Sequence, residues 1–196
     1  MPDSTPSADT GGVAGTGNAG GIPEEKTGAL ATTPITDYHS TSTFRCSKSS
    51  RVEQFFIKEW PLLRERNYCK VFVLEDNDNP STILGYYTLS SAILLKENLS
   101  NSDEKNSPLG MHAPMVRIGF MGKHDKAMRG TGALLAVDAA KRVMQIADLG
   151  IWGIVLEPEL GTGDNKLADF YRSLGFKTCR KANSMYVAAK DLALRA

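Results

Sequence analysis

An apolar strand, a loop with two glycines and a long helix follow one another in residues 115–148, and this order constrains the fold most strongly. The loop ends in Arg129-Gly130-Thr131-Gly132, where the helix is expected to begin. The first turn of a helix leaves backbone N–H groups unpaired and carries a partial positive charge. Because glycines let a phosphate approach this backbone closely, the pattern predicts an anion site, although a plain glycine turn into a helix would look the same.

The spacing of the glycines excludes two common phosphate loops. A Walker loop ends in Gly-Lys-Ser or Gly-Lys-Thr, which is absent, and a Rossmann loop needs a third glycine where Leu135 stands. The unit also lies late in the chain, whereas a dinucleotide fingerprint belongs to the first strand and helix of its fold. A different phosphate-containing ligand is therefore expected.

Hydrophobic periodicity predicts the other elements of one α/β domain. An apolar helical face runs from Val52 to Trp60, and Pro61 stands where this helix stops and a second can begin. A short helix is expected at residues 91–98, and the long helix is expected to end at Gly150. A further helix is expected at 167–175, and strands are expected at 69–76, 82–90, 114–122, 151–157, 176–180 and 184–189. This order predicts a mixed sheet, opened by a hairpin, with helices on both faces.

The first 43 residues differ in composition from the rest. Gly, Ala, Ser, Thr and Pro dominate them, and so few bulky apolar side chains cannot offset conformational entropy by burial. We expect residues 1–43 to be a disordered tail and residues 44–196 to form the domain. The tail holds one of the 23 basic and five of the 22 acidic residues, which leaves 22 basic and 17 acidic residues in the domain. This modest positive charge tolerates an anionic partner without requiring one.

The sequence does not indicate a membrane or secreted protein. No apolar run approaches the ~20 residues that span a bilayer, and the start MPDSTPSADT lacks the character of a secretory signal. Cys46, Cys69 and Cys179 are odd in number and widely spaced, so they fit neither a disulfide framework nor a zinc site. We therefore expect a cytoplasmic protein without a metal.

Several segments together resemble the GNAT N-acetyltransferases. RGTGALLAVDAAKR after a strand is similar to their acetyl-CoA motif, Q/R-x-x-G-x-G/A, with Ala127 at the Gln/Arg position and the basic residue at Arg129 instead. ADFYRSLGF is similar to their late helix. VFVLEDNDNPSTILGYYTLS resembles two strands of one branch, the toxins of toxin–antitoxin pairs that acetylate the amino group of aminoacyl-tRNA. The resemblance covers about residues 44–190.

The resemblance implies an α/β domain with the GNAT fold, in which six to seven strands splay apart between the fourth and the fifth. It also implies acetyl-CoA as co-substrate, with the pantetheine arm in that gap. Asn165, just before the late helix, is one implied contact, although its residue type alone favours a helix N-cap. The other implied contacts to acetyl-CoA are Phe120, Met121, Gly122, Arg129, Gly130, Thr131, Gly132 and Ala133.

Tyr171, on the late helix, matches the general acid of the family. A phenol with a pKa of about 10 can hand its proton to a thiolate whose conjugate acid has a pKa of about 8.5. Periodicity alone would make Tyr171 a half-buried aromatic of an amphipathic helix. A base such as Glu157 would be needed for a lysine or polyamine, since an α-amino group with a pKa of about 7.7–8.0 is partly neutral at pH 7. His112 and His124 lie in polar loops and are interpreted as bystanders.

The resemblance further implies aminoacyl-tRNA as acceptor and a ribbon-helix-helix antitoxin as partner, and it allows a homodimer. Basic side chains near the cleft would contact the phosphates of tRNA. The candidates are Arg117, Lys123, Lys126, Arg142, Arg180 and Lys181. Two alternatives stay open: an acetyltransferase for a small amine, a polyamine or a protein N-terminus, and a GNAT-fold binding protein without catalysis.

Overall fold

A seven-stranded mixed sheet forms the centre of the domain, with the strand order β1-β2-β3-β4-β5-β7-β6. The computed structural model describes residues 31–108, 111–146, 148–159 and 166–193. Neighbouring strands are antiparallel except β4 and β5, which are parallel. The predicted mixed sheet is therefore confirmed. The strands are β1 Thr33–Pro34, β2 Lys70–Glu75, β3 Ile83–Leu94, β4 Ala113–Lys123, β5 Gly153–Leu156, β6 Lys177–Thr178 and β7 Met185–Ala188.

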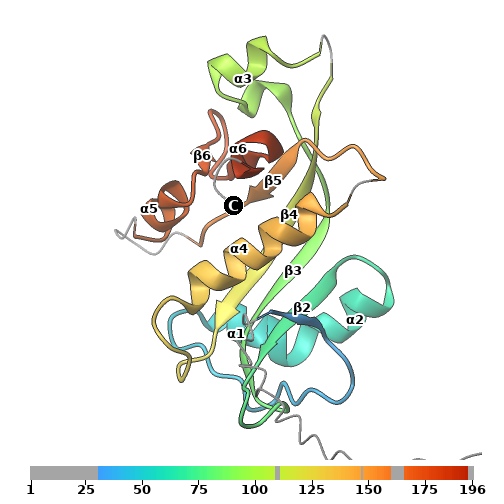
Figure 1. Ribbon diagram of the computed structural model, residues 1–196, viewed down its shortest axis with the longest axis vertical. Coiled ribbons are helices and arrows are strands. Elements are labelled where there is room, and N and C mark those ends of the chain that lie inside the picture. Colours follow the sequence, from blue (N-terminus) through green and yellow to red (C-terminus); the bar gives the residue numbers. More distant parts are fainter. Residues whose placement is uncertain (1–30, 109–110, 147, 160–165, 194–196) are drawn as a thin grey trace, which may run out of the picture.

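Helices cover both faces of the sheet, as predicted. Figure 1 shows α4 (Thr131–Met144) crossing β3 and β4. Tyr87 of β3 belongs to the core beneath α4, whereas its neighbour Tyr86 packs with Phe55 and Phe56 on the opposite face, because successive strand residues point to opposite sides. The other helical elements are α1 Ser50–Gln54, η1 Phe55–Glu59, α2 Trp60–Glu65, η2 Lys96–Asn98, α3 Asn101–Lys105, α5 Lys166–Ser173 and α6 Ala189–Ala193.

The first helical stretch begins at a side-chain cap. Ser49 Oγ accepts a hydrogen bond from the Val52 N–H over 3.1 Å, which satisfies one of the free donors of α1. A π-helical turn, η1, follows, and α2 begins at Trp60 with Pro61 in its first turn. The second helix thus begins next to Pro61 as predicted, but the first does not stop there, because the chain stays helical from Ser50 to Glu65. Val52 of α1 packs against Gly122 near the end of β4.

Two predicted boundaries are wrong. Residues 91–94 do not begin a helix but extend β3, where Ile93 pairs with Pro114 and Leu94 with Ala113. The side chains of this stretch alternate, with Ile93 exposed and Leu94 buried, which is the period of a strand. The long helix ends at Met144 and not near Gly150, so Ile146 lies beyond it and is exposed.

Residues 31–43 belong to the folded structure, so the predicted boundary at residue 43 places too much chain in the tail. β1 adds a strand to the edge of β2, and the Thr32 hydroxyl donates to Asp138 Oδ2 of α4 over 2.5 Å. Tyr87 donates to the same oxygen, and Arg142 donates to the Thr32 carbonyl. Burial alone would raise the pKa of Asp138, but these hydrogen bonds and the Arg142 charge lower it. Residues 1–30 lie outside the described residues.

Candidate functional site

The parallel pair β4–β5 opens into a gap, as predicted. The register pairs Met115 with Gly153 at one end and Ile118 with Leu156 at the other. β4 continues to Lys123 beside β3, whereas β5 ends at Leu156. In the described part of the chain, no strand lies beside β4 beyond Ile118 on that edge. Backbone groups of this edge can therefore serve a ligand.

A β-bulge shapes β4 at the gap. Gly119 and Phe120 together oppose Thr88, because the register shifts between Tyr87 and Leu89 of β3. The Phe120 N–H donates to Thr88 Oγ1 over 2.9 Å, so a hydroxyl replaces the ladder partner that the bulge removes. The bulge re-aims the side chains that follow Ile118, and it does so at the position where β5 turns away.

Two adjoining hollows occupy the gap, an inner one of about 90 Å³ and an outer one of about 600 Å³. The inner hollow reaches α5, and the outer one reaches the loop between β6 and β7. Residues that line both are Arg51, Ile118, Gly119, Phe120, Glu157, Pro158 and Glu159. Val52, Met121, Leu156, Leu167 and Tyr171 line only the inner hollow, and Arg117 and Asn183 line only the outer one. The gap thus connects the α4–α5 face of the sheet with the α1 face.

The phenol of Tyr171 lies at the inner hollow. Its ring is 6% exposed and packs edge-on against Phe170 and Phe176. The hydroxyl points to Met121 Sδ of β4 at 3.9 Å, and the described residues offer it no stronger partner. Burial raises the pKa of Tyr171 to about 12. Tyr171 is therefore a protonated donor at neutral pH, and its hydroxyl lies at the edge where β4 and β5 separate.

The glycine loop leads into the start of α4 as the sequence predicts. Gly130 is the N-cap residue with φ 97°, a left-handed conformation that favours glycine. The Ala133 N–H already donates to the Gly130 carbonyl over 2.9 Å, whereas the Gly132 N–H has no acceptor in the part of the chain that the structure describes. A Cβ on Gly132 would meet only Phe170, at an ordinary 3.9 Å. Packing therefore does not require glycine at position 132, and the surface above it is open to a ligand.

Two residues at the base of the glycine loop anchor it to the chain that precedes α1. His124 is buried and accepts a hydrogen bond from the Lys126 N–H at Nδ1, over 3.0 Å. Its other ring nitrogen lies 3.3 Å from the Thr43 carbonyl. The Asp125 carboxylate accepts from both the N–H and the hydroxyl of Ser47. His124 is thus a structural residue of the loop, a role that the sequence alone did not indicate.

The wall formed by α1 was not predicted from the sequence. The Arg51 guanidinium lies over the Phe120 ring, 5.0 Å from its centroid, and Phe120 stacks on Phe55 at 3.8 Å. Ser49, the N-cap residue of α1, also donates to the Glu159 carboxylate beyond β5. These residues are far apart in the sequence and match no motif, so only the fold brings them together at the gap.

The predicted acetyl-CoA contacts fall into four groups. Phe120 and Met121 line the gap, and residues 129–133 form the loop end and first turn of α4. Gly122 lies against α1 instead, where a Cβ would come within 2.4 Å of Val52 Cγ1, so packing explains this glycine. Asn165 lies outside the described residues. Glu157, a candidate base and not a predicted contact to acetyl-CoA, is exposed at the rim, with its carboxylate 3.7 Å from the Arg117 guanidinium.

Two of the six basic candidates are committed to internal contacts. Arg142 bonds to Tyr87, Asp138 and Thr32 under α4. Arg180 bonds to Glu104 and to neighbouring groups near α3. Arg117 lines the outer hollow, and the Lys123 ammonium donates to the Ala127 carbonyl. Lys126 and Lys181 are exposed, so the candidates do not all serve one surface.

The described residues hold neither a membrane-spanning helix nor a cluster of metal ligands. None of their helices is long and apolar enough to cross a bilayer. No group of three or more His, Cys, Asp or Glu side chains among them is placed to hold a metal ion.

Comparison with known proteins shows the fold. No protein-family model matches this chain. Among solved structures, a tyrosine-to-phenylalanine mutant of KacT superposes with a TM-score of 0.75 at 21% identity, over 85% of this chain and 98% of that one. AtaT complexed with acetyl-methionyl-tRNAfMet gives a TM-score of 0.74 at 23% identity, over 84% and 98% of the two chains. The chain therefore has the GNAT fold of these proteins.

A third similar structure is a tyrosine-to-phenylalanine mutant of the AtaT toxin bound to the C-terminus of the antitoxin AtaR and to acetyl-CoA. It gives a TM-score of 0.65 at 20% identity, over 84% of this chain and 96% of that chain. The three comparisons agree on the fold over nearly the whole domain.

Proposed function

We propose that this chain is an acetyl-CoA-dependent N-acetyltransferase that acetylates the amino group of aminoacyl-tRNA and thereby acts as a translation-blocking toxin. The observation that carries the proposal is the buried hydroxyl of Tyr171 at the opening between β4 and β5, beside Met121. The GNAT fold shared with AtaT and KacT supports it, because an acyl transferase of this fold needs a ligand path and a proton donor at this edge.

The residues present fit acetyl-CoA. Its diphosphate would lie at residues 129–133, where the partial charge of α4, the open surface above Gly132 and the Arg129 side chain all favour an anion. The free edge of β4 at Phe120 and Met121 would hold the pantetheine arm by backbone hydrogen bonds. Gly122 would contribute by allowing α1 to approach β4, and Asn165 remains a proposed contact.

Tyr171 would act as the general acid. Acetyl-CoA supplies the acetyl group as a thioester, whose sulfur needs a proton as it leaves. Because burial raises the pKa of Tyr171 to about 12, its hydroxyl holds the proton at any physiological pH. The side chain has little freedom, since the ring is buried and packs against both Phe170 and Phe176. The phenol is thus held in place before the reaction, which lowers the entropic cost of proton transfer.

The acceptor amine would enter from the α1 face, through the outer hollow. The inner hollow is too small for both substrates, whereas the outer one has about 600 Å³ and a polar rim with Arg51, Arg117 and Glu157. An α-amino group with a pKa of about 7.7–8.0 is partly neutral at pH 7, so it needs no strong base here. The complex of AtaT with acetyl-methionyl-tRNAfMet supports a charged tRNA as the acceptor class.

The remaining features of the proposal concern partners and place. The AtaT toxin has been solved with an antitoxin, AtaR, which supports an antitoxin for this chain as well. The ribbon-helix-helix fold of that partner rests on the resemblance in sequence alone. A charged tRNA as substrate requires the cytoplasm. We further propose that the acetyltransferase domain does not need residues 1–30 for catalysis.

The proposal is tested by incubating the protein with labelled acetyl-CoA and, in parallel, charged bulk tRNA, the same tRNA after deacylation, spermidine and a peptide with a free N-terminus. We expect label only with charged tRNA, released by mild base as an N-acetyl amino acid. Label in spermidine or the peptide would keep the enzyme and refute the acceptor. Calorimetry that shows no binding of acetyl-CoA would refute the enzyme itself.

A further inference from the structure

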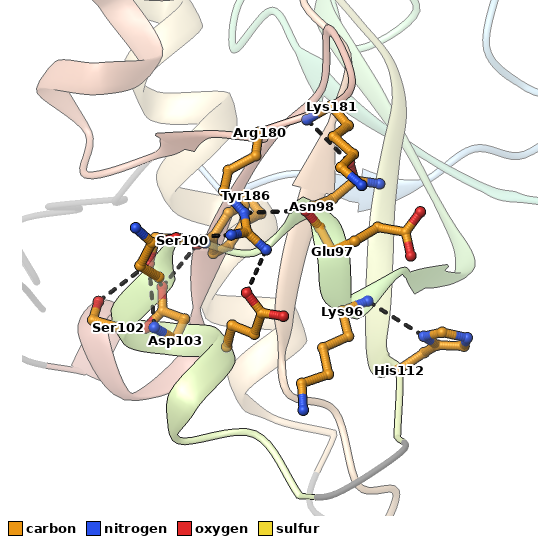
Figure 2. Close-up of polar contacts among 12 residues, drawn as sticks. Lys96, Glu97, Asn98, Ser100, Ser102, Asp103, His112, Arg180, Lys181 and Tyr186 are labelled. Atoms are coloured by element: carbon orange, nitrogen blue, oxygen red, sulfur yellow. Dashed lines mark hydrogen bonds and ion pairs between the residues drawn. The ribbon is translucent and has the colours of Figure 1, made fainter.

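The loop between β6 and β7 is positioned by a segment from a distant part of the chain. β6 has only two residues, so the sheet fixes this hairpin weakly. Figure 2 shows that its polar contacts go instead to residues 96–104, the stretch that contains η2 and the start of α3. The Arg180 and Lys181 N–H groups donate to the backbone and side-chain oxygens of Asn98, over 3.1 and 3.2 Å.

Arg180 makes the most contacts of this group. Its Nε donates to the Glu97 carbonyl over 3.1 Å, and one terminal nitrogen donates to Asn101 Oδ1 over 2.7 Å. The other terminal nitrogen pairs with the Glu104 carboxylate. All three nitrogens of the guanidinium are therefore engaged, and the planar fork ties the loop to Glu97, Asn101 and Glu104.

A second anchor lies just behind the loop. Asp103 is buried and accepts hydrogen bonds from Tyr186 of β7, over 2.8 Å, and from Lys177 of β6, over 2.9 Å. Tyr186 in turn accepts from the Ser100 N–H over 2.7 Å. Both strands of the hairpin are thus tied to α3, and Arg180 extends this attachment into the loop.

The loop so anchored carries a residue of the candidate site. Asn183, three positions after Arg180, lines the outer hollow together with Arg51 and Arg117. The outer hollow is the route proposed for the acceptor, so this inference rests on the proposed function. A shift of the loop would change the width of the acceptor route and leave the start of α4, where acetyl-CoA is proposed to bind, unchanged.

We propose that Arg180 is a positioning residue for the acceptor: through Glu104 and residues 97–101 it holds the β6–β7 loop, and with it Asn183, at the wall of the outer hollow. This role differs from a direct contact between Arg180 and a tRNA phosphate, which the residue type alone would favour. Glu104 distinguishes the two roles. Its carboxylate cannot attract a phosphate, but it is needed to hold the Arg180 side chain against α3.

The test compares the parent with Arg180→Gln, Arg180→Lys and Glu104→Gln. Arg64→Gln is the matched control, since Arg64 of α2 forms an exposed ion pair with Asp37, which precedes α1. The apparent KM for charged bulk tRNA is measured at several salt concentrations, together with kcat, the Kd for acetyl-CoA and the melting temperature. Arg180→Lys keeps the charge and the pairing with Glu104, so it is expected to fall between the parent and Arg180→Gln.

We expect Arg180→Gln and Glu104→Gln to raise this KM alike, by about tenfold, because a displaced wall misplaces the acceptor. In both variants the salt dependence of KM and the Kd for acetyl-CoA should equal those of the parent. The Arg64→Gln control should have the same KM as the parent. A phosphate contact would instead lower the salt slope by about one in Arg180→Gln and leave Glu104→Gln unchanged, which would overturn the proposal. Unchanged KM in both folded variants would also overturn it. A parent that does not acetylate charged tRNA would refute the proposed function before the variants are compared.

Discussion

Replacing Gly132 by glutamate is expected to stabilise the fold while it abolishes binding of acetyl-CoA. Gly132 is the second residue of α4, and a Cβ there meets nothing closer than Phe170 at 3.9 Å. Removing a glycine from a helix gains about 0.5–1 kcal/mol, and a carboxylate in the first turn gains about 0.3–1 kcal/mol from the helix dipole. At about 2–4 °C per kcal/mol for a domain of this size, the melting temperature should rise by roughly 2–8 °C.

The same carboxylate would stand where the diphosphate is proposed to bind. Two unit charges about 4 Å apart repel by about 4 kcal/mol near a protein surface, a factor of about a thousand in affinity, and solvent screening reduces this. We therefore expect the Kd for acetyl-CoA to rise by about 30- to 1,000-fold. Gly132→Ala is the matched control: it should gain the helix propensity and lose less affinity, because it adds a methyl group without a charge.

Differential scanning calorimetry and titration calorimetry with acetyl-CoA measure the two effects on the same preparations. A stabilised Gly132→Glu protein that binds acetyl-CoA as tightly as the parent would refute the diphosphate site at the start of α4. A Gly132→Glu protein that melts lower than the parent would show that residue 132 is packed and not open.

Three further outcomes are expected. Tyr171→Phe should lower kcat by about 10²- to 10⁴-fold in single-turnover assays and leave the Kd for acetyl-CoA unchanged. The rate of the parent should rise with pH up to about 8 and show no loss from Tyr171 up to about pH 11, because the protonated phenol is the active form. A loss of rate near pH 9 would contradict this role of Tyr171. Asp103→Asn should destabilise the protein by about 1–3 kcal/mol at pH 7, measured by urea unfolding. Burial raises the pKa of Asp103, but hydrogen bonds from Lys177, Tyr186 and Ser100 lower it overall. The stability that Asp103 contributes is therefore present above about pH 4 and is lost as the pH falls further. An equally steep acid transition in Asp103→Asn would count against this role. Gly122→Ala should destabilise the fold by about 1–3 kcal/mol, since its Cβ would overlap Val52, and a melting temperature equal to that of the parent would contradict this packing.

Local patterns of the sequence predicted the parts of the site that depend on neighbouring residues. The glycines before α4 and the apolar alternation of β4 are local signals, and both led to the correct elements. Tyr171 was located through a resemblance over a short helix, and the structure places its hydroxyl at the gap.

The parts that could not be predicted depend on contacts between distant residues. Arg180 and Glu104 are 76 positions apart, and Arg180 alone has the character of a surface charge. β1 escaped prediction because a two-residue strand with exposed side chains shows no hydrophobic period; it is held by the edge of β2 and by the contacts of Thr32 with α4. Residues 91–94 were misassigned since a short apolar run fits a helix or a strand, and only pairing with β4 decides between them.

A crystal structure of the protein with acetyl-CoA tests the central claim most directly. We expect the diphosphate at residues 129–133, the pantetheine arm along the free edge of β4 and the thioester sulfur within hydrogen-bonding distance of the Tyr171 hydroxyl. Acetyl-CoA bound on another surface, or a sulfur separated from that hydroxyl by other side chains, would contradict the proposed site.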